Sequence, residues 1–457
     1  MSISTTNPAT GEVLKTFDAM SEEAVEAALG RSVQGLAALR GTSFAERAEW
    51  MRAAADVLDR EQEEIARVMV TEMGKTIKAA RAEVSKCATG CRFYAENAER
   101  FLADEPVDAA SVKASKAYVR YVPLGPVLAI MPWNFPLWQA IRFAAPALMA
   151  GNVGLLKHAS NVPQTALFLE EMFRRGGFPA GSFQSLLIGS DQVESVLTDR
   201  RVRAATLTGS EAAGRAVAEI AGREVKKTVL ELGGSDPFVV MPSADLDRAA
   251  EVATTARCQN NGQSCIAAKR FLVHTDVYDA FTEKFVDQMR ALVVGDPMDE
   301  RTDVGPLATE QGRETVAEQV RDAVDKGAAV LLGGQAPHVP GWWYPPTVVA
   351  DLTPDMRMWR EEVFGPVAGL FRVSSYEEAV EIANDVDYGL GSNAWTTDSA
   401  EQERFANDLD AGLTFINGMV TSYPELPFGG VKHSGYGREL SHHGIREFCN
   451  IKTVWVG

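Results

Sequence analysis

The stretch that decides the fold reads Ala-Ala-Thr-Leu-Thr-Gly-Ser-Glu-Ala-Ala-Gly-Arg-Ala-Val-Ala-Glu-Ile-Ala over residues 204–221. Its first part, residues 204–207, is a short apolar run that indicates a buried strand. Gly209 allows a tight turn and Ser210 can cap a helix, and residues 212–221 have a helix-like pattern. A strand that leads through a short turn into a helix is the repeating unit of a parallel α/β sheet.

Short apolar runs alternate with helical stretches from about residue 125 onward. The runs indicate strands at residues 127–131, 153–156, 183–188, 204–207, 228–230, 238–241, 271–274, 367–371 and 414–417. Helical stretches lie between several of them, at residues 164–175, 212–221, 280–292 and 376–383. This alternation predicts an α/β protein with two doubly wound units and a crevice between them.

Residues 20–104, ahead of the first of these strands, are predicted to be helical. Ser43 and Glu46 have the spacing of a capping box before one apolar stripe. A later stripe contains Cys87 and Cys91 at helical spacing. We therefore predict that these two cysteines are buried packing residues.

Length and composition narrow the classes of function. A chain of 457 residues is too long for one core, so two or three domains are expected. A formal net charge of -17 without a run of lysine or arginine argues against nucleic acid as a partner. No apolar stretch approaches ~18 residues, and the first residues lack a basic and apolar leader. A cytoplasmic protein that does not enter a membrane is expected.

The cysteine and histidine contents bear on redox state and metal binding. Five widely spaced cysteines do not form a disulfide framework, so reduced thiols are expected and one of them is free to be a nucleophile. The six histidines include no H-x-x-x-H pair, and no Cys-x-x-Cys motif is present. No metal site is therefore expected.

Two glycine-rich stretches resemble phosphate-binding motifs, but each lacks a feature that such a motif requires. Residues 389–394 match the dinucleotide fingerprint loosely, yet they follow no clear strand and lead into an extended segment. Residues 74–76, Gly-Lys-Thr, resemble the end of a P-loop. However, Met69 occupies the position where a P-loop has its first glycine. Neither stretch is expected to bind phosphate.

Two strand ends carry better candidates for ligand binding. Free N–H groups at Gly209 and Ser210 would attract a pyrophosphate, although an ordinary capped helix is the alternative. Asn134 follows the predicted strand 127–131 inside Met-Pro-Trp-Asn-Phe-Pro. Ligands gather at the carboxyl ends of strands in α/β sheets, so Asn134 is a candidate amide donor. A proline-rich turn without function is the alternative.

Glu231 and Cys265 are the candidate base and nucleophile. Glu231 ends a predicted strand and precedes Leu-Gly-Gly, so its carboxylate can face a cavity while the backbone turns. Cys265 ends the sequence Asn-Gly-Gln-Ser-Cys, whose small residues allow close approach. A helix beginning at Cys265 would lower the pKa of its thiol.

Five motifs together resemble the aldehyde dehydrogenase superfamily, in that family's order and spacing. They are Pro-Trp-Asn-Phe-Pro around Asn134, Glu-Leu-Gly-Gly from Glu231, Gly-Gln-Ser-Cys ending at Cys265, Glu-Val-Phe-Gly-Pro from Glu362 and Pro-Phe-Gly-Gly-Val-Lys-His-Ser-Gly from Pro427. The regions around residues 138–142, 157–160 and 259–270 resemble, more closely, bacterial succinate-semialdehyde dehydrogenases of a short type.

This resemblance implies an aldehyde dehydrogenase-like fold and the oxidation of an aldehyde with NAD(P). Cys265 would attack the aldehyde carbon and form a thiohemiacetal and then a thioester. The Asn134 amide and the Cys265 backbone N–H would hold the oxyanion. Glu231 would activate water for hydrolysis, for which its pKa should be raised.

The resemblance also implies cofactor contacts. They would come from Trp133, Lys157, Ser160, Gly209, Ser210, Gly214, Leu232, Glu362 and Phe364. Glu362 would hold the nicotinamide ribose, while Lys157 and Ser160 would hold the adenosine ribose. Because members that prefer NAD often carry Glu at the position of the neutral Ser160, NADP is expected to be preferred and NAD to be used less well. Alternatively, Ser160 only leaves space and both cofactors work.

The resemblance implies substrate contacts from Arg142, Trp138, Ser422 and Phe428. The Arg142 guanidinium would bind the distal carboxylate of succinate semialdehyde, since guanidinium and carboxylate form paired hydrogen bonds. A salt bridge at the surface or between domains is the alternative role of Arg142. Some semialdehyde dehydrogenases carry a second arginine where this chain has Gln259, and a second cysteine where it has Ala267.

Rival readings of the function remain at this stage. Glutarate semialdehyde or another short aliphatic aldehyde is the main alternative substrate. A cofactor-independent cysteine hydrolase and a non-catalytic protein that kept the fold are the alternatives from other classes.

The family fold implies domain limits. A cofactor domain would comprise residues 1–103 and 122–233, and a catalytic domain residues 234–437. An oligomerisation arm would join residues 104–121 to residues 438–457, so a homodimer or homotetramer is expected.

Overall fold

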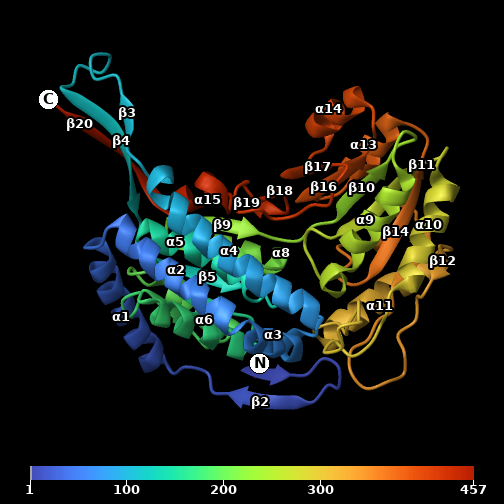
Figure 1. Ribbon diagram of the computed structural model, residues 1–457, viewed down its shortest axis with the longest axis horizontal. Helices are drawn as coiled ribbons and strands as arrows, with labels where there is room; N and C mark the ends of the chain where they lie inside the picture. The colour runs from blue at the N-terminus through green and yellow to red at the C-terminus, as the bar shows by residue number, and fades with distance from the viewer. Residues whose placement is uncertain (1–2) are drawn as a thin grey trace.

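The computed structural model describes residues 3–457 as two α/β lobes and a projecting arm (Figure 1). One sheet lies in each lobe, and a third, smaller sheet forms the arm. The chain leaves the first sheet and enters the second at Gly233 and Gly234. Sequence segments that carry the candidate chemistry come from both sides of this crossing.

The sheet of the first lobe has six strands. They are β5 (Pro126–Met131), β6 (Val153–His158), β7 (Phe183–Ser185), β8 (Ala204–Thr208), β9 (Lys227–Glu231) and β19 (Gly435–Tyr436). Their order is β19-β9-β8-β5-β6-β7, and all neighbours are parallel except the antiparallel pair β19 and β9. The carboxyl ends of β5, β8 and β9 therefore lie along one edge, which brings Asn134, Ser210 and Glu231 together on one side of the lobe.

Helices and an N-terminal hairpin complete the first lobe. The helices are α1 (Glu22–Arg40), α2 (Phe44–Arg60), α3 (Gln62–Met73), α4 (Ile77–Phe101), α5 (Trp138–Ala150), α6 (Pro163–Gly176), η1 (Ser190–Gln192), α7 (Val193–Thr198), α8 (Glu211–Arg223) and α15 (Ser441–Glu447). The hairpin pairs β1 (Ile3–Thr6) with β2 (Val13–Phe17). Helix α4 packs against α2 and α5, and its apolar stripe lies in the main core.

The sheet of the second lobe has seven strands. They are β10 (Asp236–Val240), β11 (Ala268–His274), β12 (Ala329–Leu332), β13 (Thr347–Ala350), β14 (Val367–Val373), β16 (Gly391–Trp395) and β17 (Leu413–Ile416). The order is β12-β13-β14-β11-β10-β16-β17, with only β12 antiparallel to its neighbour. The sheet is accompanied by α9 (Leu246–Cys258), η2 (Gln259–Gly262), α10 (Tyr278–Ala291), α11 (Glu310–Asp325), α12 (Arg357–Arg360), α13 (Tyr376–Asn384) and α14 (Ser399–Asp408).

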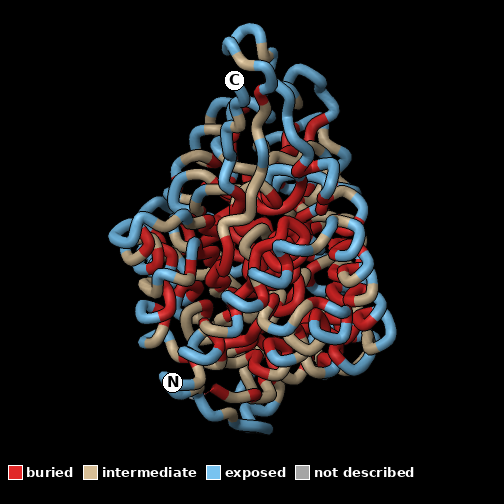
Figure 2. Tube along the Cα trace, turned by 90° about the vertical axis from the view of Figure 1, so that its left-hand side faces the viewer, coloured by how far each residue is buried: buried red, intermediate tan, exposed pale blue. Residues whose placement is uncertain are grey.

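Two small sheets complete the structure. Strands β15 (Tyr388–Gly389) and β18 (Val431–Lys432) form an antiparallel pair. The arm consists of β3 (Glu105–Val107), β4 (Lys116–Pro123) and β20 (Cys449–Val456), in the order β20-β4-β3. Figure 2 shows that the arm is largely exposed, whereas the buried residues concentrate in the body of the molecule.

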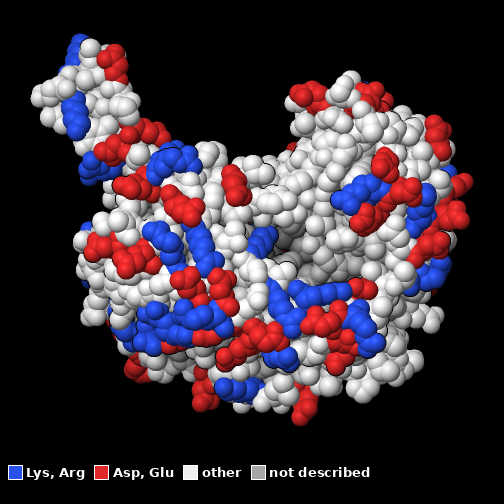
Figure 3. All heavy atoms as spheres, in the orientation of Figure 1, with Lys and Arg blue, Asp and Glu red and all other residues white. Residues whose placement is uncertain are grey.

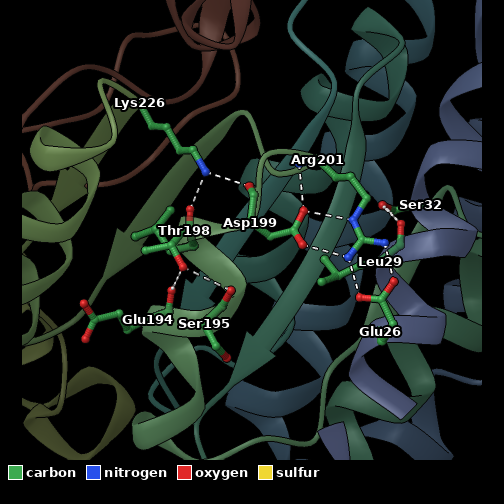
Figure 4. Close-up of polar contacts among 10 residues, drawn as sticks. Glu26, Leu29, Ser32, Glu194, Ser195, Thr198, Asp199, Arg201 and Lys226 are labelled. Atoms are coloured by element: carbon green, nitrogen blue, oxygen red, sulfur yellow. Dashed lines mark hydrogen bonds and ion pairs between the residues drawn. The ribbon is translucent and has the colours of Figure 1, made fainter. Parts of the chain in front are cut away.

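A cluster of charged side chains fastens α1 to the chain segment that precedes β8 (Figure 4). Arg201 donates to Glu26 of α1 at 2.7 Å and to Asp199 at 2.7 Å. Lys226 donates to the backbone carbonyls of Leu197 and Asp199, at 2.5 and 2.7 Å. The Arg201 contacts tie α1 to the segment before β8, and the Lys226 contacts tie that segment to the start of β9, so both support interior strands of the first sheet.

The strands and helices predicted from the sequence are confirmed, and one strand is shorter than predicted. Each predicted strand is present, but the run 183–188 is a strand only over Phe183–Ser185. The capping box of Ser43 and Glu46 is formed, and Cys87 and Cys91 are buried in the core. Among residues 3–457, no helix is both long enough and apolar enough to span a bilayer.

Both glycine-rich stretches that were rejected as phosphate sites have structural roles instead. Residues 388–395 are almost wholly extended, in β15 and β16. Gly74 ends α3 in a left-handed conformation and Thr76 caps α4. Lys75 is buried and forms an ion pair with Glu83 of α4.

Candidate active site

Two cavities meet at Cys265, and residues of both lobes line each of them. Figure 3 shows that the surface is hollowed between the lobes. The first cavity has a volume of about 610 Å³ and is lined by Pro132, Trp133, Asn134, Thr208, Gly209, Ser210, Leu232, Gly233, Cys265, Glu362 and Phe364. The second is lined by Lys86, Phe135, Trp138, Gln139, Arg142, Gln259, Ser264, Cys265, Ile266, Val420, Thr421, Ser422 and Phe428. Cys265 is thus accessible from two sides, which suits a nucleophile that must meet both a cofactor and a substrate.

The loop that carries Cys265 is held in an unusual backbone conformation. Asn260, Asn261 and Gly262 all have positive φ angles, of 54°, 58° and 74°. Asparagine tolerates this region through local hydrogen bonds, and Gly262 has no side chain to obstruct it. A Cβ atom at Gly262 would lie 2.3 Å from the backbone of Gly365. Glycine at position 262 therefore lets the loop pack directly on the segment that carries Glu362 and Phe364.

Side-chain amides of the same loop fix it to its surroundings. Asn261 Nδ2 donates to the carbonyls of Gly74 and Pro306, and its Oδ1 accepts from Gly305 N–H. Asn260 Nδ2 donates to Asn134 O at 2.8 Å and to Gln263 O at 3.0 Å. The nucleophile loop and the loop of Asn134 are therefore joined directly.

No helix begins at Cys265, so the condition under which a helix terminus would lower the pKa of its thiol is not met. Cys265 lies in a turn between η2 and β11, so no helix dipole acts on its sulfur. Although its surface is partly exposed, Cys265 lies deep in the protein, and withdrawal from water raises the pKa of its thiol to about 12. The cations Arg142 and Lys269 oppose this rise. Thiolate formation thus depends on nearby positive charge rather than on a helix terminus.

Lys269 connects the loop of Cys265 to Glu362, which lines the first cavity. Its buried ammonium group donates to the carbonyls of Ser264 and Cys265, at 2.9 and 2.5 Å. The same group lies 3.4 Å from the Glu362 carboxylate. Glu362 also accepts a hydrogen bond from Gly234 N–H at 3.2 Å. One cation therefore orients both the loop of Cys265 and the carboxylate that faces the first cavity.

The segment that carries Asn134 is anchored by a buried carboxylate. Glu83 of α4 accepts hydrogen bonds from the backbone N–H groups of Leu137 and Trp138, both at 2.9 Å, and pairs with Lys75. A carboxylate at the first turn of α5 satisfies N–H groups that no helix carbonyl can reach. The Asn134 amide nitrogen donates to Gln263 O at 3.2 Å. It retains a second hydrogen for a ligand in the first cavity.

Glu231 is buried at the end of β9, beside a second carboxylate. Burial raises its pKa well above the ordinary value, and the neighbouring Glu439 raises it further. This confirms the expected direction of the shift. Glu439 forms a buried ion pair with Arg142, whose charge lowers the pKa of Glu231 in turn. Glu231 is not among the residues that line either cavity, although its neighbour Leu232 lines the first.

Most of the predicted cofactor residues line the first cavity together. Trp133 and Phe364 pack edge to face across it, with ring centroids 5.8 Å apart. Ser210 caps α8 by accepting from Ala213 N–H. Lys157, Ser160 and Gly214 do not line this cavity. Lys157 is the penultimate residue of β6, and a Cβ on Gly214 would lie 2.6 Å from the Leu232 side chain. Gly214 therefore lets Leu232 pack against α8.

All four predicted substrate residues line the second cavity. The buried Arg142 guanidinium lies 4.3 Å from the ring centroid of Phe428 and pairs with Glu439. Trp138 Nε1 donates to Ser422 Oγ at 2.9 Å. Arg142 therefore takes part in a salt bridge, as the alternative reading of the sequence held, but this bridge is buried beside the cavity of Cys265 rather than on the surface.

Sequence reasoning missed four charged residues around the site, namely Glu83, Lys86, Lys269 and Glu439. Each lies within an ordinary helix, strand or loop pattern and belongs to none of the motifs. The only signal is local, since Lys269 lies in the stretch 259–270 that carries the closer resemblance. Their partners are distant in sequence, as with Glu439 and Arg142.

Comparison with known proteins identifies the family. The model of the Aldehyde dehydrogenase family matches residues 1–454. The chain belongs to this family. Its Cys265, Asn134 and Glu231 therefore stand in a fold that is shared by aldehyde dehydrogenases.

Relatives of this aldehyde dehydrogenase have similar lengths. The chain is 64% identical to a succinate-semialdehyde dehydrogenase [NADP(+)] of Mycolicibacterium paratuberculosis, over all of this chain and 97% of that protein. It is 65% identical to succinate-semialdehyde dehydrogenase [NADP(+)] 1 of Mycobacterium tuberculosis, and each chain is covered completely. The chain also resembles succinic semialdehyde dehydrogenase from Streptococcus pyogenes, whose crystal structure was determined in complex with NADP+. The two sequences are 40% identical, and the structures superpose with a TM-score of 0.96 over 99% of both chains.

Replacing Glu83 with glutamine is expected to destabilise the protein strongly. The variant leaves the buried Lys75 ammonium without its counter-ion, and breaking a buried pair costs roughly 3–5 kcal/mol of unfolding free energy. Thermal and denaturant unfolding measure the loss. Glu63→Gln is the matched control, because Glu63 pairs with Arg81 at the surface and such pairs contribute about 0–1 kcal/mol. Equal losses in the two variants would contradict the anchoring role.

Replacing Lys269 with methionine is expected to move thiol reactivity to higher pH. The Lys269 cation lowers the pKa of Cys265, so its removal raises that pKa and reduces the thiolate fraction at any given pH. The pH dependence of inactivation by iodoacetamide measures this shift. Lys269→Arg, which keeps the charge, should stay closer to the parent profile. An unchanged or more acidic profile in Lys269→Met would refute the electrostatic role.

Proposed function

We propose that this aldehyde dehydrogenase oxidises succinate semialdehyde to succinate with NADP, through a thioester on Cys265. The observation that carries the proposal is the cavity on one side of Cys265, which is lined by the cations Arg142 and Lys86. Positive charge beside the nucleophile suits an aldehyde with a distal carboxylate. The relatives at 64–65% identity, which are succinate-semialdehyde dehydrogenases [NADP(+)], support the same assignment.

Residues of the first cavity fit a dinucleotide. The capped start of α8 presents backbone N–H groups that suit a pyrophosphate, and Glu362 offers carboxylate oxygens to ribose hydroxyls. NADP, when bound, accepts the hydride that leaves the substrate carbon. Trp133, Gly209, Ser210, Leu232 and Phe364 would hold it in place.

The first chemical step belongs to Cys265. Its thiolate attacks the aldehyde carbon, and the carbonyl oxygen becomes an oxyanion. The free hydrogen of the Asn134 amide and the Cys265 backbone N–H would stabilise this charge. Loss of one such donor costs about 3–4 kcal/mol of transition-state stabilisation in other enzymes. Loss of hydride then leaves a thioester on Cys265.

Hydrolysis of the thioester requires a base, and we assign this role to Glu231. A water molecule gives a proton to the Glu231 carboxylate and attacks the thioester carbon, which releases succinate and the thiol of Cys265. The raised pKa of Glu231 makes its carboxylate a stronger base than one in water. The positive charge of Arg142 limits this rise.

Preference for NADP is assigned to Ser160 and Lys157. Ser160 brings no negative charge to the adenosine ribose, and Lys157, three residues earlier, is half-buried at the end of β6. A cation attracts a 2′-phosphate, which a carboxylate would repel. NAD is expected to be used less well.

The arm is assigned to assembly of a homodimer or homotetramer. Its terminal strand β20 exposes Ile451 and Trp455 by 65% and 54%, and one edge of the strand has no neighbour among the described residues. Exposed apolar strand edges favour pairing with another chain.

We further propose that residues 1–103 and 122–233 form the cofactor domain, residues 234–437 the catalytic domain, and residues 104–121 with 438–457 the arm. The enzyme is proposed to act in the cytoplasm.

Initial rates at 340 nm test the proposed function. Succinate semialdehyde and butanal are compared, each with NADP and with NAD, for the parent enzyme and for Arg142→Ala. The expected result is a strong preference for succinate semialdehyde and for NADP, with a reduced substrate preference in the variant. Equal kcat/KM for the two aldehydes would overturn the substrate assignment. Faster turnover with NAD would overturn the cofactor assignment.

A further inference from the structure

Lys86 brings a second cation to the cavity beside Cys265. It lies on α4, and its ammonium group is 4.6 Å from the ring centroid of Trp138. The same group donates to Ser422 Oγ at 2.7 Å. Trp138, Ser422 and Lys86 all line the second cavity together with Cys265. The Lys86 side chain therefore lines the same cavity as the candidate nucleophile.

Lys86 lacks a carboxylate partner, unlike the other cation of the cavity. Within residues 3–457, no carboxylate oxygen lies within 4 Å of Lys86 Nζ, whereas Arg142 pairs with Glu439. Glu83, three residues before Lys86, is already engaged by Lys75. An ammonium group withdrawn from water without a counter-ion is unfavourable. The cavity thus holds an unbalanced positive charge, which an anionic ligand would neutralise.

The hydroxyl of Ser422 is oriented by its two donors. Its oxygen accepts hydrogen bonds from Lys86 Nζ at 2.7 Å and from Trp138 Nε1 at 2.9 Å. A serine oxygen has two lone pairs, so both are used. Its own hydrogen is left to donate to a third group. Lys86 and Ser422 therefore present an ammonium group and a hydroxyl donor side by side.

We propose that Lys86, with the Ser422 hydroxyl that it orients, binds the distal carboxylate of the aldehyde substrate and so determines specificity for a semialdehyde. This inference rests on the proposed function. Gln259 lines the same cavity without a charge, so Lys86 from α4 provides the second cation. Arg142 adds positive electrostatic potential to the cavity, but its guanidinium remains paired with Glu439.

The assignment has a consequence for pH. Burial lowers the pKa of Lys86 to about 8, an effect to which the Arg142 cation adds and which Cys87 and Glu83 oppose. Lys86 is charged below this pH and neutral above it. The preference for a carboxylate-bearing aldehyde is therefore expected to decline as the pH rises through about 8. Arginine at position 86 would keep its charge over this range.

The experiment compares Lys86→Met, Lys86→Arg and Lys78→Met with the parent enzyme. Lys78 lies on the same helix, but it is exposed and pairs with Asp303. For each enzyme, kcat/KM with NADP is measured for succinate semialdehyde and for butanal between pH 6.5 and pH 9.5, values chosen to bracket pH ~8. The ratio of the two constants is the readout, because titration of the shared groups Cys265 and Glu231 largely cancels in it.

The ratio is expected to fall roughly 10- to 100-fold in Lys86→Met, the loss that accompanies removal of a charge-assisted hydrogen bond. Lys86→Arg should recover most of the preference and hold it at high pH, and Lys78→Met should match the parent. A ratio within twofold of the parent in Lys86→Met, while the parent prefers the semialdehyde, would overturn the role of Lys86. A parent ratio near one would instead overturn the proposed substrate.

Discussion

The hydrogen bonds of Asn260 join the two halves of the active site. Its amide nitrogen donates to the backbone of Asn134, which the first sheet carries, and to the backbone of Gln263, next to the nucleophile. The proposed oxyanion donor and Cys265 thus share one rigid connection across the boundary between lobes. Gly262 and the left-handed backbone before it make this approach possible. A catalytic constellation needs such support, because small displacements of reacting groups reduce rates greatly.

Charge is the second constraint on the site. Buried acids and bases alternate around Cys265: Lys269 faces Glu362, Arg142 faces Glu439, and Glu231 lies beside that pair. Burial raises the pKa of the Cys265 thiol and of Glu231. The cations Arg142 and Lys269 oppose this rise for the thiol, and Arg142 opposes it for Glu231. Lys86 alone in this group is without a carboxylate partner among residues 3–457. The arrangement therefore separates the charges that are paired within the protein from the Lys86 charge, which we propose the substrate uses.

Much of this molecule is predictable from its sequence, since local patterns determine strands, helices and caps. The run 204–221 predicts a strand, a turn and a capped helix, and the structure has all three. Cys265, Asn134 and several of the proposed cofactor residues, such as Glu362, lie in motifs that can be recognised without a structure. Whether a helix begins at Cys265 could not be decided from the sequence, since the loop before it is held by contacts between distant residues, such as Asn261 with Pro306. Glu83, Lys86, Lys269 and Glu439 escaped notice because their partners are brought near only by folding.

The central claim is that a thioester on Cys265 awaits hydrolysis by water that Glu231 activates. Intact-mass measurement of Glu231→Gln, mixed with NADP and succinate semialdehyde and then quenched, tests it most directly. The account predicts a succinyl adduct that peptide mapping places on Cys265, that hydroxylamine removes, and that is absent from Cys265→Ala. Formation of NADPH by Glu231→Gln at the parent's steady-state rate, with no adduct on Cys265, would contradict the account.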